Sequence, residues 1–124
     1  MLGHITTFGG HPVNCAAANA CIDVLKTETW IDEAQSKGEF LSSMLLQNNE
    51  VIEVRQKGLF FAVEMGSFER VKLVVDTCLE KGLIGFWFLS TPTAFRLSPP
   101  LSITNQELEE AGRIILEAIL ETKA

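Results

Sequence analysis

The sequence lacks any long apolar run. Its uninterrupted apolar stretches, such as residues 83–89, are far shorter than the roughly 20 residues that a membrane-spanning helix needs. It also lacks a basic N-terminal flank followed by an apolar segment, which is the pattern of a secretory signal. We therefore expect a cytoplasmic protein without a membrane partner.

Cysteine and histidine are scarce and are not arranged for metal binding. Cys15, Cys21 and Cys78 are an odd number without C-x-x-C spacing, and each lies among apolar neighbours. This pattern is typical of small buried thiols and argues against a disulfide framework or a zinc site. Neither histidine has a nearby Asp, Glu or Cys at metal-ligand spacing, and no G-x-S-x-G nucleophile motif occurs. We expect neither a metal centre nor a hydrolase.

Positive charge is also in the minority. The 10 Lys and Arg residues are outnumbered by 16 Asp and Glu residues, which gives a net charge of -6. A phosphate backbone would be repelled by this balance, so we expect no nucleic-acid partner. By contrast, 47% of the 124 residues are hydrophobic, which is enough for the core of one domain.

Hydrophobic periodicity predicts a mixed α/β fold of the α+β type, a small domain with a three-stranded sheet covered by helices. The expected order is helix, helix, strand, helix, strand, strand, helix. The predicted helices cover residues 14–27, 29–47, 68–81 and 104 onward, and the predicted strands cover 51–65, 83–89 and 94–98. The strand at 51–65 is expected to be bent or bulged at Lys57-Gly58. The strands on either side of the third helix could pair in parallel, whereas the tight connection at 90–93 favours antiparallel neighbours.

Polar residues mark where three of these helices begin. Ser67 can cap the third helix, and Thr104 with Glu107 forms a capping box for the last one. We expect the hydroxyl of Thr29 to cap the amides around Asp32 in the second helix.

A threonine and glycine loop near the N-terminus is the first candidate site. Thr6 and Thr7 precede Phe8 and the glycine pair Gly9-Gly10, so hydroxyls and unobstructed amides could be presented to a phosphate. The alternative is a flexible entry loop whose threonines form only local hydrogen bonds.

The second candidate is Arg96, which lies between Phe95 and Leu97 in an otherwise apolar strand. Alternation places its guanidinium on the opposite face, where its planar fork could bind a carboxylate in bidentate fashion. The alternative is an arginine on a solvated face or edge of the sheet. The aromatic segments 60–61 and 86–88 are typical of core strands or an interface.

Several segments, in this order, resemble the landmarks of class III aminotransferases, the family of acetylornithine, ornithine and 4-aminobutyrate aminotransferases. They are Thr6-Thr7-Phe8-Gly9-Gly10-His11-Pro12, Arg55-Gln56-Lys57-Gly58-Leu59, Lys81-Gly82-Leu83 and Phe95-Arg96-Leu97-Ser98-Pro99-Pro100-Leu101. The resemblance covers nearly the whole chain, and the succession of landmarks makes it specific.

The resemblance implies a cofactor, a partner and roles for both candidate sites. The cofactor is pyridoxal 5'-phosphate (PLP), whose phosphate in the neighbouring subunit of a homodimer would be bound by Thr7, with Thr6 as a less certain companion. Arg96 would bind the carboxylate of an amino acid or a 2-oxo acid substrate. Residues 1–28 would be the loop and connecting helix that lead from a large domain. Residues 29–124 would be the small domain, as in the C-terminal domain of fold-type I PLP transferases.

The Schiff-base lysine of the family lies upstream of the threonine loop, and no lysine precedes Thr6 here. The first is Lys26, so we expect no catalytic residue in this chain and no transamination by the chain alone. It could be an expressed fragment, a truncated gene product or one piece of a split enzyme. Two other functions are compatible with the same landmarks: a truncated paralogue that acts as a dimerisation or interaction module, and a related PLP aminomutase or decarboxylase.

Overall fold

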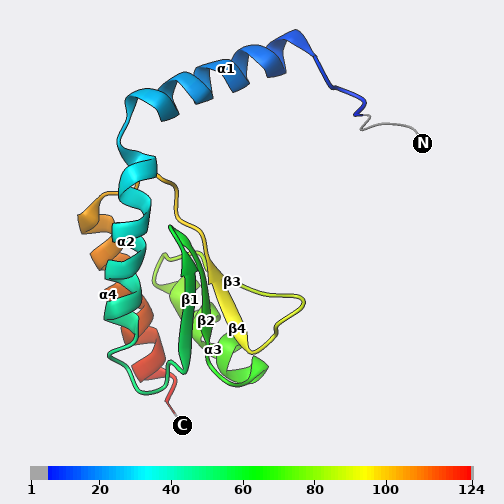
Figure 1. The fold of residues 1–124 in the computed structure, drawn as a ribbon. Helices are drawn as coiled ribbons and strands as arrows, with labels where there is room; N and C mark the ends of the chain where they lie inside the picture. Colours follow the sequence, from blue (N-terminus) through cyan, green and yellow to red (C-terminus); the bar gives the residue numbers. More distant parts are fainter. Residues whose placement is uncertain (1–5, 124) are drawn as a thin grey trace.

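The fold is a single antiparallel sheet with helices packed against one face and a further helix that projects away. The computed structural model describes residues 6–123 (Figure 1). Its elements are α1 (Pro12–Thr27), α2 (Trp30–Leu45), β1 (Glu53–Lys57), β2 (Phe60–Glu64), α3 (Phe68–Glu80), β3 (Phe86–Trp87), β4 (Ala94–Leu97) and α4 (Asn105–Glu121). The mixed α/β architecture is as predicted, but the sheet has four strands instead of three.

The additional strand arises within residues 51–65, which form a hairpin and not one bent strand. β1 and β2 pair antiparallel from Glu53↔Glu64 to Lys57↔Phe60. The chain reverses at Gly58, whose φ of 55° lies in the left-handed region that glycine adopts without strain. The glycine predicted to mark a bulge therefore marks a tight turn.

The sheet order is β1-β2-β4-β3, and every neighbouring pair is antiparallel. The parallel pairing considered for the strands around α3 is therefore wrong, because β4 lies between β2 and β3. The antiparallel arrangement expected for the connection at 90–93 is confirmed. β3 is shorter than the predicted strand at 83–89, and the side chains of Ile84 and Leu89 are 83% and 93% exposed.

The core lies between the sheet and the helices α2, α3 and α4. Phe61 and Val63 of β2 and Phe95 of β4 are buried on this side, where they pack with the apolar stripes of the helices. The stripes include Leu41, Leu45, Val71, Val75, Cys78, Leu108, Ile115 and Ala118. The opposite face of the sheet, which we call the open face, carries Phe60, Arg96 and Phe86, all exposed.

Local capping agrees with the prediction at two of the three helices. Ser67 Oγ accepts a hydrogen bond from Arg70 N at 3.2 Å, and the capping box of Thr104 and Glu107 is present. Thr29 does begin α2, but its hydroxyl donates to the Glu33 carboxylate instead of capping a backbone amide. A glutamate one turn away therefore competes successfully for this hydroxyl.

α2 approaches the β1–β2 turn very closely. A Cβ at Gly38, in the middle of the helix, would collide with the carbonyl oxygen of Gly58. The absence of a side chain at Gly38 is thus a condition for packing the helix on the hairpin.

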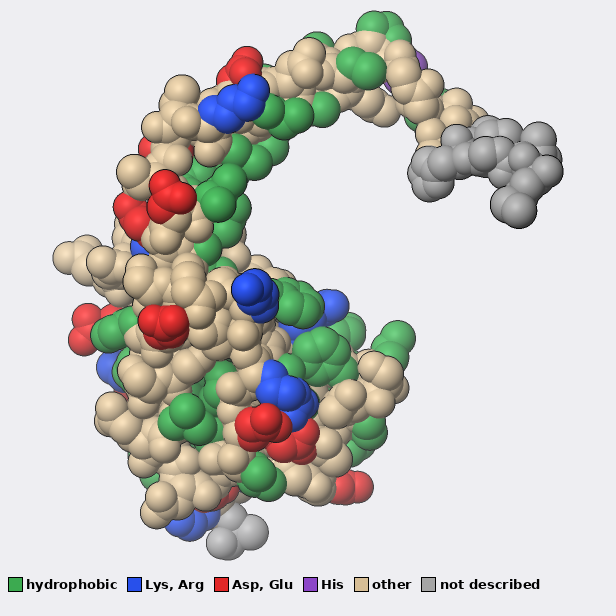
Figure 2. Space-filling model, viewed as in Figure 1, with side chains coloured by type: hydrophobic (Ala, Val, Ile, Leu, Met, Phe, Trp, Pro, Cys, Tyr) green, Lys and Arg blue, Asp and Glu red, His purple; other side chains and the backbone are tan. Residues whose placement is uncertain are grey.

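α1 extends away from the other elements and has no buried residue (Figure 1). It begins at Pro12, two residues before the predicted start. Hydrophobic side chains gather along the concave side of the α1–α2 arm (Figure 2). Cys15 and Cys21 are exposed on α1, contrary to the prediction, and only Cys78 is buried among the three cysteines. None of the helices in the described part of the chain is long and apolar enough to cross a membrane.

Candidate functional site

Arg96 lies in β4 with its side chain on the open face of the sheet. Its neighbours Phe95 and Leu97 point into the core and are almost fully buried, whereas Arg96 is exposed. Strand alternation therefore places the guanidinium as the sequence predicts.

The guanidinium of Arg96 has no carboxylate partner among residues 6–123. The other three arginines are ion-paired: Arg55 with Glu53 and Glu64, Arg70 with Glu50, and Arg113 with Glu110 and Glu117. Arg96 also donates no side-chain hydrogen bond to a described residue. Its five N–H donors are consequently free for a ligand from outside this part of the chain.

Glu64, an acidic residue on the strand next to Arg96, is already bound to other groups. Glu64 is on the neighbouring strand β2, where it accepts a hydrogen bond from Gly66 N at 3.2 Å and pairs with Arg55 at 3.4 Å. Hydrogen bonding by the Thr93 hydroxyl, followed by these two contacts, lowers the pKa of Glu64 below its ordinary value. Glu64 thus remains ionised and bound to groups other than Arg96.

Among residues 6–123, the guanidinium of Arg96 lies close to the aromatic ring of Phe86. Phe86 and Arg96 are register partners across β3 and β4, and Arg96 Cζ lies 5.8 Å from the ring centroid. On the other side, the register partner of Arg96 is Ala62, whose short side chain leaves that flank open. Of the two roles that the sequence predicts for Phe86, core packing is wrong because this residue is 47% exposed, whereas packing at an interface stays a prediction.

Phe86 is a residue that the sequence pattern does not identify as part of the site. Its position beside Arg96 follows from the pairing register of β3 and β4, which depends on how many residues the connection after Trp87 uses. The only indication of this strand pairing in the sequence is the pair of short apolar runs on either side of that connection.

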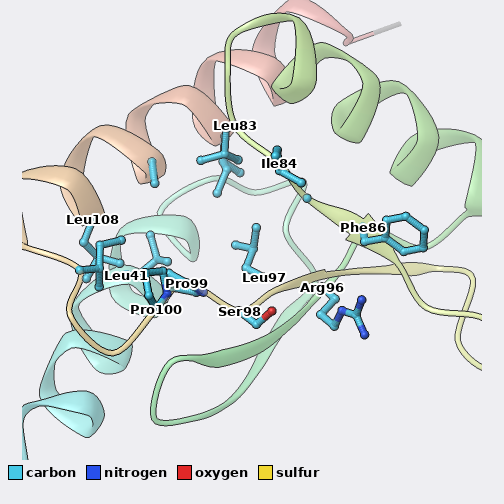
Figure 3. A pocket seen from close by; sticks show the side chains of 14 residues that line it. Leu41, Leu83, Ile84, Phe86, Arg96, Leu97, Ser98, Pro99, Pro100 and Leu108 are labelled. Carbon is cyan, nitrogen blue, oxygen red and sulfur yellow. The ribbon is translucent and has the colours of Figure 1, made fainter. Parts of the chain in front are cut away.

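An apolar pocket of about 420 Å³ lies next to Arg96, between the sheet and α4. Leu83, Leu97, Pro99 and Leu108 contribute to its lining. Figure 3 shows the Arg96 side chain directed away from Leu41 and Leu108, toward the side where Phe86 lies. The guanidinium is therefore at the rim of the pocket and not in its interior.

The threonine loop forms a pair of turns before α1. Gly9 N donates to Thr6 O at 3.2 Å and His11 N donates to Phe8 O at 3.1 Å. Gly10 has a φ of 77°, and a Cβ at this position would meet nothing within 4 Å. Thr6 and Thr7 are exposed, so their hydroxyls border open space. Residues 1–5, which precede Thr6, lie outside the described part of the chain.

The two candidate sites are not brought together within one chain. The threonine loop is at the far end of α1, and this 16-residue helix is about 24 Å long at 1.5 Å per residue (Figure 1). Among residues 6–123, no group of three or more His, Cys, Asp or Glu side chains is placed to hold a metal ion.

The chain matches known aminotransferases over nearly its whole length. Residues 1–119 match the family described as aminotransferase class-III. An acetylornithine aminotransferase of Haemophilus ducreyi is 34% identical over 118 residues, which cover 95% of this chain and 29% of that protein. An ornithine aminotransferase of Macrococcus caseolyticus is 36% identical over 111 residues, which cover 87% and 27%.

Solved structures agree with this match. An aminotransferase of Bacillus anthracis superposes with a TM-score of 0.86 at 26% identity, covering 98% of this chain and 31% of that one. The ornithine aminotransferase of Toxoplasma gondii gives a TM-score of 0.83 at 31% identity, covering 95% and 29%. The chain thus spans less than a third of the length of each of these relatives, and it belongs to the class III aminotransferase family.

Proposed function

We propose that this chain is the C-terminal part of a PLP-dependent aminotransferase subunit. The complete subunit would transfer an amino group between an amino acid or amine and a 2-oxo acid. Residues 29–124 would form the small domain, and residues 1–28 the loop and helix that join it to a large domain. The family match over almost the whole chain, combined with its small share of each relative, supports the proposal that it is part of a longer subunit. The absence of any buried residue on α1 supports the division after residue 28.

Arg96 would bind the substrate carboxylate. The observation that carries this assignment is that Arg96 alone among the four arginines has no acidic partner within residues 6–123. A guanidinium fork that is exposed and free of acids matches a carboxylate in charge and geometry. The open flank beside Ala62 provides space for the carboxylate to approach.

Thr7, with Thr6 beside it, would hold the phosphate of PLP. The loop fits this group, because two exposed hydroxyls adjoin a glycine pair and the space around Gly10 is open. PLP, when bound, supplies the electron sink for amino transfer. Since the loop lies at the far end of α1 from Arg96, we propose that it serves the site of the other subunit in a homodimer.

Two lysines of this chain, Lys37 and Lys81, are held by contacts with other residues. Lys81 pairs with Glu121 and Glu117, and the hydrogen bond to Glu121 is the main reason that its pKa is raised. Lys37 donates to Ile103 O at 2.8 Å. Both amines are engaged with oxygen atoms of other residues, and we propose that the reactive lysine is supplied from outside this chain.

The carboxylate assignment is tested by Arg96→Ala in the complete enzyme that carries this chain. Losing a hydrogen-bonded charge contact costs about 1.5–3 kcal/mol, so KM for the amino acid should rise about 10- to 100-fold while bound PLP is retained. Arg113→Ala is the matched control, because Arg113 lies on α4 in ion pairs with Glu110 and Glu117. An unchanged KM in Arg96→Ala would remove Arg96 from the substrate site.

A further inference from the structure

We propose that Phe86 is a positioning residue for Arg96, holding the guanidinium over the open face of the sheet with its N–H donors free. This inference rests on the proposed carboxylate-binding role of Arg96. The contact with Phe86 would explain how the exposed and unpaired side chain of Arg96 keeps one orientation.

The first step is the geometry of the contact. Phe86 and Arg96 are direct partners across an antiparallel pair, so their side chains leave the same face of the sheet next to each other. The distance of 5.8 Å from Arg96 Cζ to the ring centroid is within the range of about 6 Å at which a ring face attracts a cation.

The second step is the chemistry of the contact. A ring face interacts with the flat side of a guanidinium, whereas the N–H donors point outward in the guanidinium plane. An acidic partner would use these donors, as Glu53 and Glu64 do at Arg55. An aromatic partner can therefore hold the side chain without competing with a carboxylate ligand.

The third step is that Phe86 is itself held in place. Its ring stacks on Trp87, with centroids 4.7 Å apart and an interplanar angle of 20°. Trp87 in turn forms a T-shaped contact with Phe68, with ring centroids 6.2 Å apart and an interplanar angle of 90°. Phe68 is the first residue of α3, directly after the cap at Ser67. The ring under Arg96 is thus linked through two aromatic contacts to a capped helix end.

The test compares three variants of the complete enzyme. Phe86→Leu keeps apolar bulk but removes the ring, and KM for the amino acid should rise about 2- to 5-fold, the effect of an exposed cation–π contact. The value of kcat should be unchanged, and Phe86→Tyr, which keeps the ring, should restore the original KM. Phe60→Leu is the matched control, because Phe60 is on the same open face and 52% exposed but is not the register partner of Arg96.

A double-mutant cycle separates the possible results. In the Arg96→Ala background, Phe86→Leu should have no further effect on KM, because the residue through which it acts is gone. If Phe86→Leu raises KM equally in both backgrounds, or leaves it unchanged where Arg96→Ala raises it, the positioning role is wrong and the function of Arg96 stands. If Arg96→Ala itself leaves KM unchanged, both proposals are wrong.

Discussion

Burial sets the reactivity of individual thiols in this chain. Cys78 is buried on α3, and desolvation raises its pKa to about 11, with Lys81 lowering it slightly. Cys15 and Cys21 are exposed on α1. Cys78 is therefore inaccessible and poor in thiolate, the form that reacts with alkylating agents, whereas Cys15 and Cys21 are accessible to such agents.

We expect iodoacetamide to modify Cys15 and Cys21 but not Cys78 in the native chain. At about pH 8, a thiol with a pKa near 11 is roughly one part in a thousand thiolate, and burial also blocks access. Peptide mass spectrometry before and after denaturation checks this, with the two exposed cysteines as internal references. Modification of Cys78 at a similar native rate would show that α3 does not shield it.

Single-residue features were predictable from sequence where they depend on near neighbours. The orientation of Arg96 follows from Phe95 and Leu97 beside it. The exposure of Cys15 and Cys21 was not predicted, because apolar neighbours suggest burial while α1 has no element packed on it. Whether Arg96 has an acidic partner is decided by contacts between strands, which the linear sequence does not display.

At the scale of elements, the contact between α2 and the β1–β2 hairpin depends on glycine. Gly38 of α2 faces the rigid carbonyl of Gly58, whereas Gly112 of α4 faces the flexible side chain of Met44. A backbone atom cannot move without shifting the hairpin, but a methionine can change rotamer. The two helical glycines thus have different tolerance for a side chain.

Gly38→Ala should destabilise the protein by about 1–3 kcal/mol, since the added methyl forces α2 away from the hairpin. Gly112→Ala should cost less, because Met44 can move, while the gain of about 1 kcal/mol in helix propensity of alanine over glycine is common to both variants. The midpoints of urea unfolding measure both. Equal losses in the two variants would contradict the rigid contact at Gly58.

Helix ends were the best-predicted elements and strand pairing the least. The caps at Ser67 and Thr104 depend on residues three positions away, so a local pattern suffices. The prediction that the Thr29 hydroxyl caps a backbone amide was wrong, because this hydroxyl donates to the Glu33 carboxylate. The number of strands and the place of β4 between β2 and β3 depend on contacts distant in sequence, which hydrophobic periodicity does not encode.

At the scale of the whole molecule, the threonine loop lies at the far end of α1, which projects away from the sheet whose strand β4 carries Arg96 (Figure 1). Two subunits that exchange their loops would each complete the site of the other. In this proposed arrangement, each site takes Arg96 from one subunit and Thr7 from its partner.

A mixed dimer of one Thr7→Ala subunit and one Arg96→Ala subunit should therefore regain activity at limiting PLP. One of its sites carries both substitutions and the other carries neither, so we expect about half of the wild-type rate from the intact site. Differently tagged subunits allow the mixed dimer to be purified and assayed beside both parent dimers. A rate no higher than that of the parents would place both residues in the same subunit's site.

The geometry of α1 also determines what an insertion in this helix would do to the threonine loop. Each residue added to a continuous helix advances its end by about 1.5 Å and turns it by about 100°. A single insertion between Pro12 and Thr27 would therefore swing the hydroxyls of Thr6 and Thr7 around the helix axis as well as displace them. The length of α1 sets both the reach and the rotational phase of the loop, so we expect substitutions along it to be accepted far more readily than changes in its length.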